Sequence, residues 1–458
     1  MKNYITNIAK RGKFFMNIKN TNSLLQYWNK KDNLFKMNTY LIITIFIFTS
    51  INYFLYNNSI SNMLIFSIFL LLNLILLSFM NYKNKIINIL FMISFFIKSI
   101  YAYNLFINGH FPFNDSLTYL THLDAMKYGN GIKSFGDVYN VAQSLHVGYH
   151  YFIFIIDLIF KNKYALYMSN IIMFQASVVL FLNYLKDKKL NKQIINITIC
   201  FSLISFNMVI FTSNILKDSL VLFMTILSIY LYNKYTIKKE KKYILGLTVS
   251  LVILFITRIY TGVALTLAII VDYILNYNTF KKNIYNIKFN KKFILISSSI
   301  IISVVILIKY TGIWMYIDAI RISLESSFTN IPLLVIGTIK ELVRTFISPL
   351  PWNALDKIDV YSITAIDSTL AIVFGFTLLM FIVKFLKFKE LRKLTYIYII
   401  PIFIQASILG ITYNEGSVRQ RIAIFLFIPL LYCIGYFYNY NKPDKGIYEN
   451  DIDEIKHN

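Results

Sequence analysis

Apolar residues fill this chain in long runs that are separated by short polar breaks. A run of about 17–25 apolar residues is long enough to cross the bilayer core as a helix, and the chain has about a dozen such runs. The pattern therefore predicts an all-α, polytopic integral membrane helix bundle with about 12 transmembrane helices and outer juxtamembrane helices. The predicted spans are 39–57, 62–81, 85–106, 164–185, 193–212, 215–233, 243–257, 260–276, 293–309, 362–385, 394–413 and 420–438.

The polar breaks predict the orientation of these helices. Residues 1–38 hold eight Lys/Arg and one acid, which indicates a cytoplasmic basic tail, and 439–458 is a second cytoplasmic tail. The apolar segment 147–161 decides the rest. If it lies at the outer interface or re-enters, rather than crossing, every later lysine-rich segment falls on the cytoplasmic side. Those segments are 186–192, 234–242, 277–292 and 386–393, with four, five, five and four Lys/Arg.

Between the tails, the sequence predicts a transmembrane bundle over 39–438 with outer loops at 107–146 and 310–361. Apolar spacing across 313–346 indicates two amphipathic helices on the membrane surface. The run 243–276 predicts a hairpin of two short helices that turns near Arg258. One long tilted helix is the alternative, and it would bury Arg258 at membrane depth at a high cost in free energy.

Composition changes this picture little. The chain is 57% hydrophobic and 15% charged, which excludes a soluble domain of this size. The net charge of +24 is explained by lysines next to anionic lipid, so membrane lipids are expected partners and nucleic acid is not. Cys200 and Cys433 have no metal-like spacing, so neither a disulfide framework nor a zinc site is predicted.

Arginine is rare in this chain and is placed differently from lysine. Seven of the 46 Lys/Arg residues are arginine, and five of these fall in breaks predicted to be on the outer side. A guanidinium offers a planar fork of donors that matches phosphate or carboxylate, which an ammonium does not. The pattern favours anion recognition, while simple anchoring of loops is the alternative. The five outer arginines are Arg258, Arg321, Arg344, Arg419 and Arg421.

The first outer loop contains the acids that are candidates for catalysis. Asp115 follows a predicted helix, and it is either a helix cap or a general base or metal ligand at the membrane surface. Asp124 is its nearest competitor. Tyr119 and His122 lie between them as substrate-binding candidates.

Two further candidates lie in later outer breaks. Lys217 precedes Asp218 at the start of a predicted helix, where the helix dipole favours an anion and a lysine would add a phosphate contact. A snorkelling ion pair is the alternative for these two residues. Tyr260 accompanies Arg258 in the next outer turn.

His146 and His150 are four residues apart, and interfacial packing is favoured over a metal pair.

The order of these features resembles the GT-C superfamily of membrane glycosyltransferases. An outer loop with an early Asp115 and a Tyr119 is followed by Gly148-Tyr149-His150-Tyr151-Phe152 and then by short helices. The resemblance covers residues 85–276. In that superfamily an acidic catalytic residue lies in the loop after an N-terminal helix. Here Ser116 stands where a second acid is usual, and two helices precede the expected first one.

The resemblance implies a glycosyltransferase of a bacterial plasma membrane that takes part in cell-envelope polysaccharide biosynthesis. It would move a sugar from a polyprenyl-phosphate carrier to a glycan or lipid-linked acceptor on the outer face. Asp115 or Asp124 would act as the base, and the outer basic residues would bind the phosphate. No cofactor is expected, and a divalent cation is left open. The alternatives are an oligosaccharide repeat-unit polymerase and a transporter of lipid-linked glycans.

Overall fold

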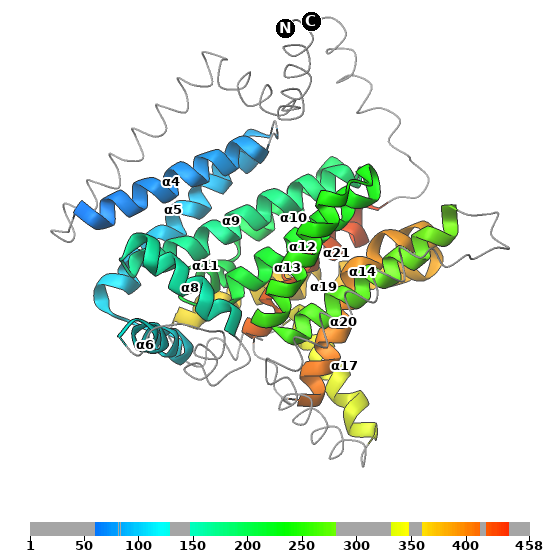
Figure 1. Ribbon diagram of the computed structural model, residues 1–458. Helices are drawn as coiled ribbons and strands as arrows, with labels where there is room; N and C mark the ends of the chain where they lie inside the picture. Colours follow the sequence, from blue (N-terminus) through cyan, green and yellow to red (C-terminus); the bar gives the residue numbers. More distant parts are fainter. Residues whose placement is uncertain are drawn as a thin grey trace, which may run out of the picture. The chain divides into compact units, whose positions relative to one another are not determined.

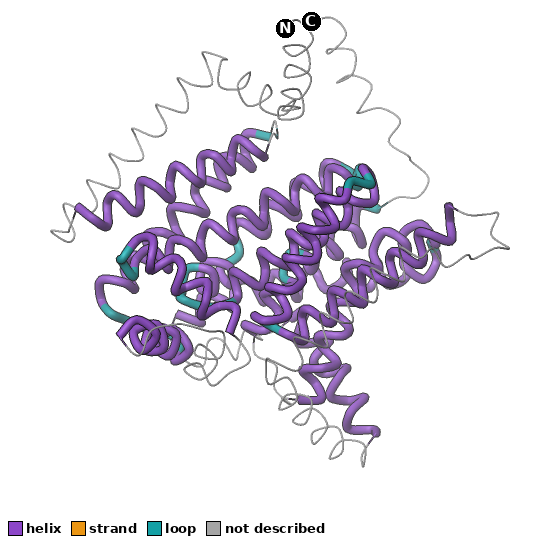
Figure 2. Tube along the Cα trace, in the orientation of Figure 1, coloured by secondary structure: helices purple, strands orange, loops and turns teal. Residues whose placement is uncertain are grey.

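The computed structural model describes residues 60–80, 82, 84–128, 147–280, 331–347, 360–412 and 418–438. Every regular element within these ranges is a helix (Figure 2). The chain divides into two compact units, Met1–Leu74 and Ile75–Asn458. The predicted spans at 39–57 and 293–309 and both tails lie outside the described residues. So do residues 129–146, 310–330 and 348–359 of the two outer loops, which include His146 and Arg321.

Within the described ranges, six helices are long and apolar enough to cross a membrane, and a bent pair makes a seventh. The described part therefore does not reach the predicted twelve spans. The six are α4 (Ile60–Met80), α5 (Lys85–Asn108), α9 (Tyr164–Asp187), α12 (Asp218–Lys238), α19 (Thr364–Lys387) and α20 (Lys389–Thr412); the bent pair is α10 (Lys192–Ile204) with α11 (Phe206–Thr212) (Figure 1). The remaining helices are α6 (Asn114–Tyr128), α8 (Val147–Phe160), α13 (Lys241–Thr257), α14 (Ile259–Phe280), α17 (Ile331–Ile347) and α21 (Phe427–Phe437), with the 3-10 helices η1 (Val360–Ile363) and η2 (Val418–Ile424).

One face of α19 carries the exposed apolar side chains that a helix in contact with lipid requires. Val373, Phe376 and Leu386 are 66%, 68% and 68% exposed, although all three are large and apolar. Exposed apolar patches of this kind are unfavourable in water and favourable against acyl chains. Together with the six long apolar helices, this face identifies the chain as a membrane protein.

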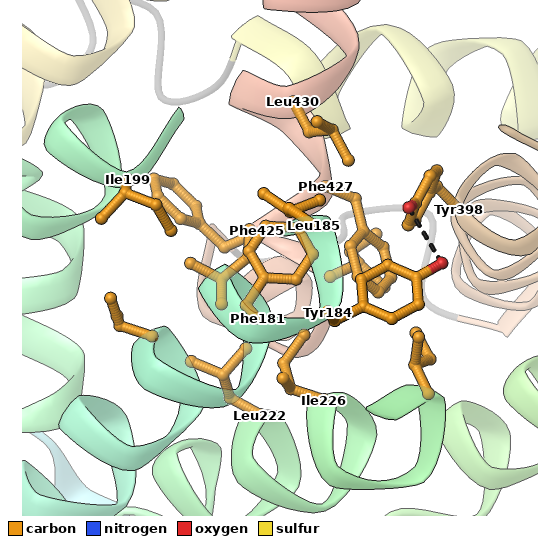
Figure 3. Packing of buried hydrophobic residues seen from close by; sticks show 14 of the residues in the cluster. Phe181, Tyr184, Leu185, Ile199, Leu222, Ile226, Tyr398, Phe425, Phe427 and Leu430 are labelled. Atoms are coloured by element: carbon orange, nitrogen blue, oxygen red, sulfur yellow. Dashed lines mark hydrogen bonds between the residues drawn. The ribbon is translucent and has the colours of Figure 1, made fainter. Parts of the chain in front are cut away.

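The core of the second unit is aromatic and aliphatic. Phe181 and Leu185 of α9 pack against Leu222 and Ile226 of α12 and against Phe427 at the start of α21 (Figure 3). The one polar contact drawn in this view joins two buried phenols, where the hydroxyl of Tyr398 donates to that of Tyr184 at 2.9 Å. Pairing the hydroxyls lets two tyrosines occupy apolar surroundings without an unsatisfied polar atom.

Helix α8 is too short to cross the bilayer. Its 14 residues span about 21 Å at 1.5 Å per residue, against a hydrocarbon core of about 30 Å. This length agrees with the prediction that 147–161 does not cross. The membrane side on which each loop lies, and with it the cytoplasmic placement of the termini, stays a prediction that cysteine labelling at positions 189 and 239 would test.

The run 243–276 forms two helices, as the sequence predicted, and the break falls at Arg258. Its backbone is extended (φ −155°, ψ 92°), which ends α13 at Thr257 and starts α14 at Ile259. Gly262 lets α14 approach α13 closely, since a Cβ there would lie 3.0 Å from the ring of Phe255. The break turns the Arg258 side chain into the bundle, where it is buried.

The predicted span at 193–212 is not one helix, which corrects the sequence analysis. It bends by 53° at Ser205 between α10 and α11. The cause comes from α19, because the Asp367 carboxylate accepts hydrogen bonds from Ser205 Oγ (2.6 Å) and from the backbone N–H groups of Phe206 (3.1 Å) and Asn207 (2.7 Å). Asp367 thus caps α11 from a distant part of the chain.

The predicted span at 420–438 also needs correction. Residues 418–424 form the 3-10 helix η2, and only 427–437 are α-helical. Pro429 explains part of the difference, because proline fits the first turn of a helix but not its interior. The η2 segment carries Arg419 and Arg421 into contact with other helices instead of along a membrane span.

Glycines allow two helices to meet at Gly337 of α17 and Gly410 of α20. A Cβ on Gly410 would lie 2.7 Å from the carbonyl carbon and oxygen of Gly337, and neither backbone atom has room to move. We expect Gly410→Ala to destabilise the protein by about 1–3 kcal/mol through overpacking, measured as a lower thermal unfolding temperature in detergent. Gly375→Ala in α19 is the matched control, because nothing lies within 4 Å of its Cβ position. Equal unfolding temperatures for the two variants would contradict this account.

Candidate functional site

Four charged side chains from four separate elements form one continuous network. Arg419 donates from Nη1 to Asp115 Oδ2 (2.7 Å) and from Nε to Asp218 Oδ2 (2.6 Å). Arg258 donates from Nη2 to Asp218 Oδ1 (2.5 Å). Asp218 is therefore held by two guanidiniums, and Arg419 connects the two carboxylates. We call Asp115, Lys217, Asp218, Arg258 and Arg419 the charged cluster.

Local structure explains why these residues meet. Asp115 lies in the first turn of α6, and Asp218 opens α12. Carboxylates are favoured at both positions, because the first turn of a helix exposes free N–H groups and the positive end of its dipole. Arg258 occupies the break between α13 and α14, and Arg419 lies on η2. Each functional side chain thus sits at a helix end, where its backbone is not constrained to a lipid-facing position.

The turn before α12 is fixed from behind by Asn170 of α9. Its side-chain amide donates to the carbonyl oxygens of Asn214 (2.5 Å) and Leu216 (3.2 Å) and to the hydroxyl of Tyr149 (3.0 Å). Asn170 is fully buried. Asn170 thus holds two carbonyl oxygens of the turn that leads into Lys217.

Aromatic rings surround the charges. The ring of Tyr119 meets that of Tyr149 edge to face, with centroids 4.7 Å apart, and the Arg258 guanidinium lies 5.6 Å from the Tyr260 ring centroid. Burial raises the pKa of the Tyr119 phenol, which keeps that group neutral beside the charges. A low-polarity wall strengthens the attraction between the ions that it encloses.

The two carboxylates differ in exposure. The Asp218 side chain is completely buried, whereas that of Asp115 is 52% exposed. Asp115 accepts one hydrogen bond through Oδ2, and its Oδ1 has no partner among the residues that the structure describes. Asp218 is thus the internal counter-ion of the arginines, and Asp115 is the carboxylate that an incoming molecule can reach.

Lys217 is the third cation of the cluster and is buried, at 8% exposed. Burial, followed by repulsion from Arg258 and Arg419, lowers the pKa of its ammonium well below the usual range. No side-chain hydrogen bond or ion pair joins it to any residue in the described ranges. Arg419 Nη2 is also buried, and no described residue accepts a hydrogen bond from it. The cluster therefore has cationic donors that the carboxylates leave unused.

Other predicted site residues lie in separate pairs. Asp124 binds Lys163 at 2.9 Å in an exposed ion pair. His122 Nδ1 lies 3.0 Å from His150 Nε2, and burial lowers the pKa of His122. This His pair joins α6 to α8. His150 thus packs against His122, and the predicted interfacial packing of His146 and His150 stays a prediction because His146 lies outside the described residues.

Arg421 and Arg344 are joined to each other through α17, apart from the charged cluster. Arg421 is buried, and its Nη1 donates to the carbonyl oxygens of Arg344 and Thr345, both at 3.0 Å. The Arg344 side chain pairs with Glu341 at 2.9 Å. Arg421 thus satisfies carbonyls near the C-terminus of α17, a position where cations are favoured.

Asp218 is the residue whose role sequence reasoning missed. In the sequence it lies beside Lys217 at a helix start. The feature that could have identified Asp218 was this pair of opposite charges inside an apolar stretch. What could not be seen was that two arginines, 40 and 201 residues later, would both bind it. Among the described residues, no three His, Cys, Asp or Glu side chains come together to hold a metal ion.

The chemistry available to the charged cluster follows from these contacts. One reachable carboxylate can accept a proton, and neighbouring cations can hold an anion or stabilise a developing negative charge. No family model, no curated protein and no solved structure matches this chain. The function of the cluster has to be inferred from its own chemistry.

Proposed function

We propose that this protein is a cell-envelope glycosyltransferase that moves a sugar from a polyprenyl-phosphate carrier to a glycan or lipid-linked acceptor. The observation that carries the proposal is Arg419, which binds the half-exposed Asp115 and the buried Asp218 at once. A carboxylate that can be reached from outside is thereby held next to several basic side chains. Transfer from a lipid phosphate needs both, a base for the acceptor and cations for the leaving phosphate.

Each residue then has a distinct role. Asp115 accepts the proton of the acceptor hydroxyl as the new glycosidic bond forms. The bond between the sugar carbon and the phosphate oxygen breaks, and the phosphate leaves with the bonding electrons. Arg419 and Lys217 stabilise that charge, and Asp218 holds Arg258 and Arg419 in place. Tyr119 and Tyr260 line the site.

A transporter of lipid-linked glycans is the second candidate, and two observations favour it. The α10–α11 pair is broken at Ser205, and Lys98 is fully buried within the long helix α5, where its ammonium donates to Ser94 Oγ at 2.6 Å. Broken helices and intramembrane charges are features of transport pathways. The repeat-unit polymerase remains the alternative enzyme, in which the arginines act and Asp115 is dispensable.

The experiment uses purified protein in liposomes with a panel of radiolabelled polyprenyl-phosphate sugars. We expect the radiolabelled sugar to leave the lipid and appear on an acceptor. Arg419→Lys should lower the rate roughly 10–100-fold, because it removes charge-assisted hydrogen bonds worth about 1.5–3 kcal/mol in total. Lys163→Arg, in the exposed pair with Asp124, is the control and should keep the wild-type rate. Label that crosses the bilayer still attached to its lipid would instead support the transporter.

A further inference from the structure

One basic residue of the charged cluster has no acidic partner within the described ranges. Arg258, Arg419 and Lys217 are three basic groups, while Asp115 and Asp218 are two acids, and both acids are bound by arginine. The arginine donors in these contacts are therefore engaged within the protein. Lys217 is the basic residue that has no such engagement among the described residues.

Two serines close to Lys217 in the sequence, and one nitrogen of Arg419, are also polar donors that are not used. In the part of the chain that the structure describes, the buried hydroxyls of Ser213 and Ser219 have no hydrogen-bond partner, and neither does Arg419 Nη2. Ser213 precedes α12 and Ser219 lies in its first turn, so these groups gather at the N-terminus of a 21-residue helix. An unsatisfied buried polar group costs free energy, and a bound oxyanion would satisfy several of these donors together.

We propose that Lys217 is the anion-binding residue of the charged cluster and that it takes up a proton when a phosphate or phosphodiester binds. This inference deepens the proposed function, but it requires only that the cluster bind an anion. The step moves one proton from solvent to the Lys217 amine, and the ammonium then pairs with the anion. Asp218 acts as a positioning residue that keeps both arginines beside it.

The direction of the pH dependence follows from the groups that face Lys217. These are Arg258 at the α13–α14 break, Arg419 on η2, Asp218 on α12, and Asp115 on α6. In the empty site, burial and the two guanidiniums lower the pKa of Lys217, so its neutral form is favoured as pH rises. A bound anion raises that pKa again. Affinity is therefore full below the pKa of the empty site and falls above it, by up to about tenfold per pH unit.

The test is calorimetry on the full-length protein in detergent, with buffers of different ionisation enthalpy between pH 6.5 and 8.5. Two probes separate the sources of the anion: sulfate stands for a free oxyanion, and dihexyl phosphate for a lipid-borne phosphodiester. Neither probe titrates in this range, so any proton taken up goes to the protein. We expect binding of at least one probe with net proton uptake, and weaker binding at higher pH.

Three variants make the test specific. Lys217→Met should weaken binding at least tenfold and abolish proton uptake. Lys217→Arg should bind with no proton uptake and with an affinity that does not depend on pH, because arginine does not deprotonate. Lys163→Met is the matched control, since Lys163 also precedes a helix with almost the same backbone angles (φ −63°, ψ −24° against φ −63°, ψ −13°), yet it is exposed and paired with Asp124.

Three results would overturn the inference: no binding of either probe, binding by the wild type without proton uptake, or unchanged binding in Lys217→Met. Proton-coupled binding in a protein that fails to transfer any sugar would leave this inference standing and remove the glycosyltransferase. Sugar transfer by Lys217→Met at the wild-type rate would remove the inference about Lys217 and leave the glycosyltransferase standing. The two proposals can therefore fail separately.

Discussion

Asp115→Asn is expected to insert into the membrane at the wild-type level and to transfer sugar about 10²–10⁴-fold more slowly, the usual contribution of a general base. Asparagine keeps the shape of the side chain and can still accept from Arg419, so the cluster should remain assembled. What is lost is the ability of the exposed oxygen to take a proton. The measurement is the rate of sugar transfer by purified protein in liposomes, with the amount of inserted protein as the reference.

The control for this prediction is Asp124→Asn. Asp124 lies nine residues later on the same helix, but its carboxylate pairs with Lys163 at the surface, and no bond joins it to the charged cluster in the described structure. We expect this variant to remain active. Full activity of Asp115→Asn would show the transferase mechanism to be wrong and would favour the arginine-based polymerase. Loss of activity only in Asp124→Asn would move the base to the competing acid.

Asp218→Asn is expected to destabilise the protein by roughly 3–5 kcal/mol, the cost of removing one partner from a buried ion pair. The carboxylate is fully buried and neutralises Arg258, which is 2% exposed, as well as Arg419. Without it, two guanidiniums repel each other in a site with little water. Thermal unfolding in detergent measures the effect, together with the yield of inserted protein.

Asp124→Asn is again a fitting comparison, because it removes an acid from an exposed pair, where the loss is about 0–1 kcal/mol. Similar unfolding temperatures for Asp218→Asn and the wild type would mean that the buried network contributes nothing to stability. That result would also contradict the proposal that Asp218 positions the two arginines.

Much of the fold followed from the sequence, because long apolar runs and lysine-rich breaks are local signals. They predicted the helices at α5, α9, α19 and α20 and the turn at Arg258. The bend at Ser205 could not be predicted, since its cause is Asp367, about 160 residues later. Nor could the 3-10 segment η2, because its conformation depends on contacts with other helices.

The candidate site was predictable in its parts and not in its connections. The rarity of arginine identified Arg258 and Arg419, and the position after a helix identified Asp115. Arg419 and Arg421 lie two residues apart, and no sequence pattern distinguishes their roles. In the structure Arg419 binds carboxylates, whereas Arg421 binds carbonyls near the end of α17. On a 3-10 helix, a difference of two residues turns the side chains to different neighbours.

The bond between Arg419 and Asp115 spans 304 residues of sequence, and that between Arg419 and Asp218 spans 201. During synthesis, Asp115 and Asp218 enter the membrane long before the arginine that joins them exists. Until η2 is made, the nascent bundle contains a buried Asp218 with only Arg258 to neutralise it, and Lys217 beside them. A chain that ends before residue 419 lacks the guanidinium that joins Asp115 to Asp218, so it cannot complete the charged cluster.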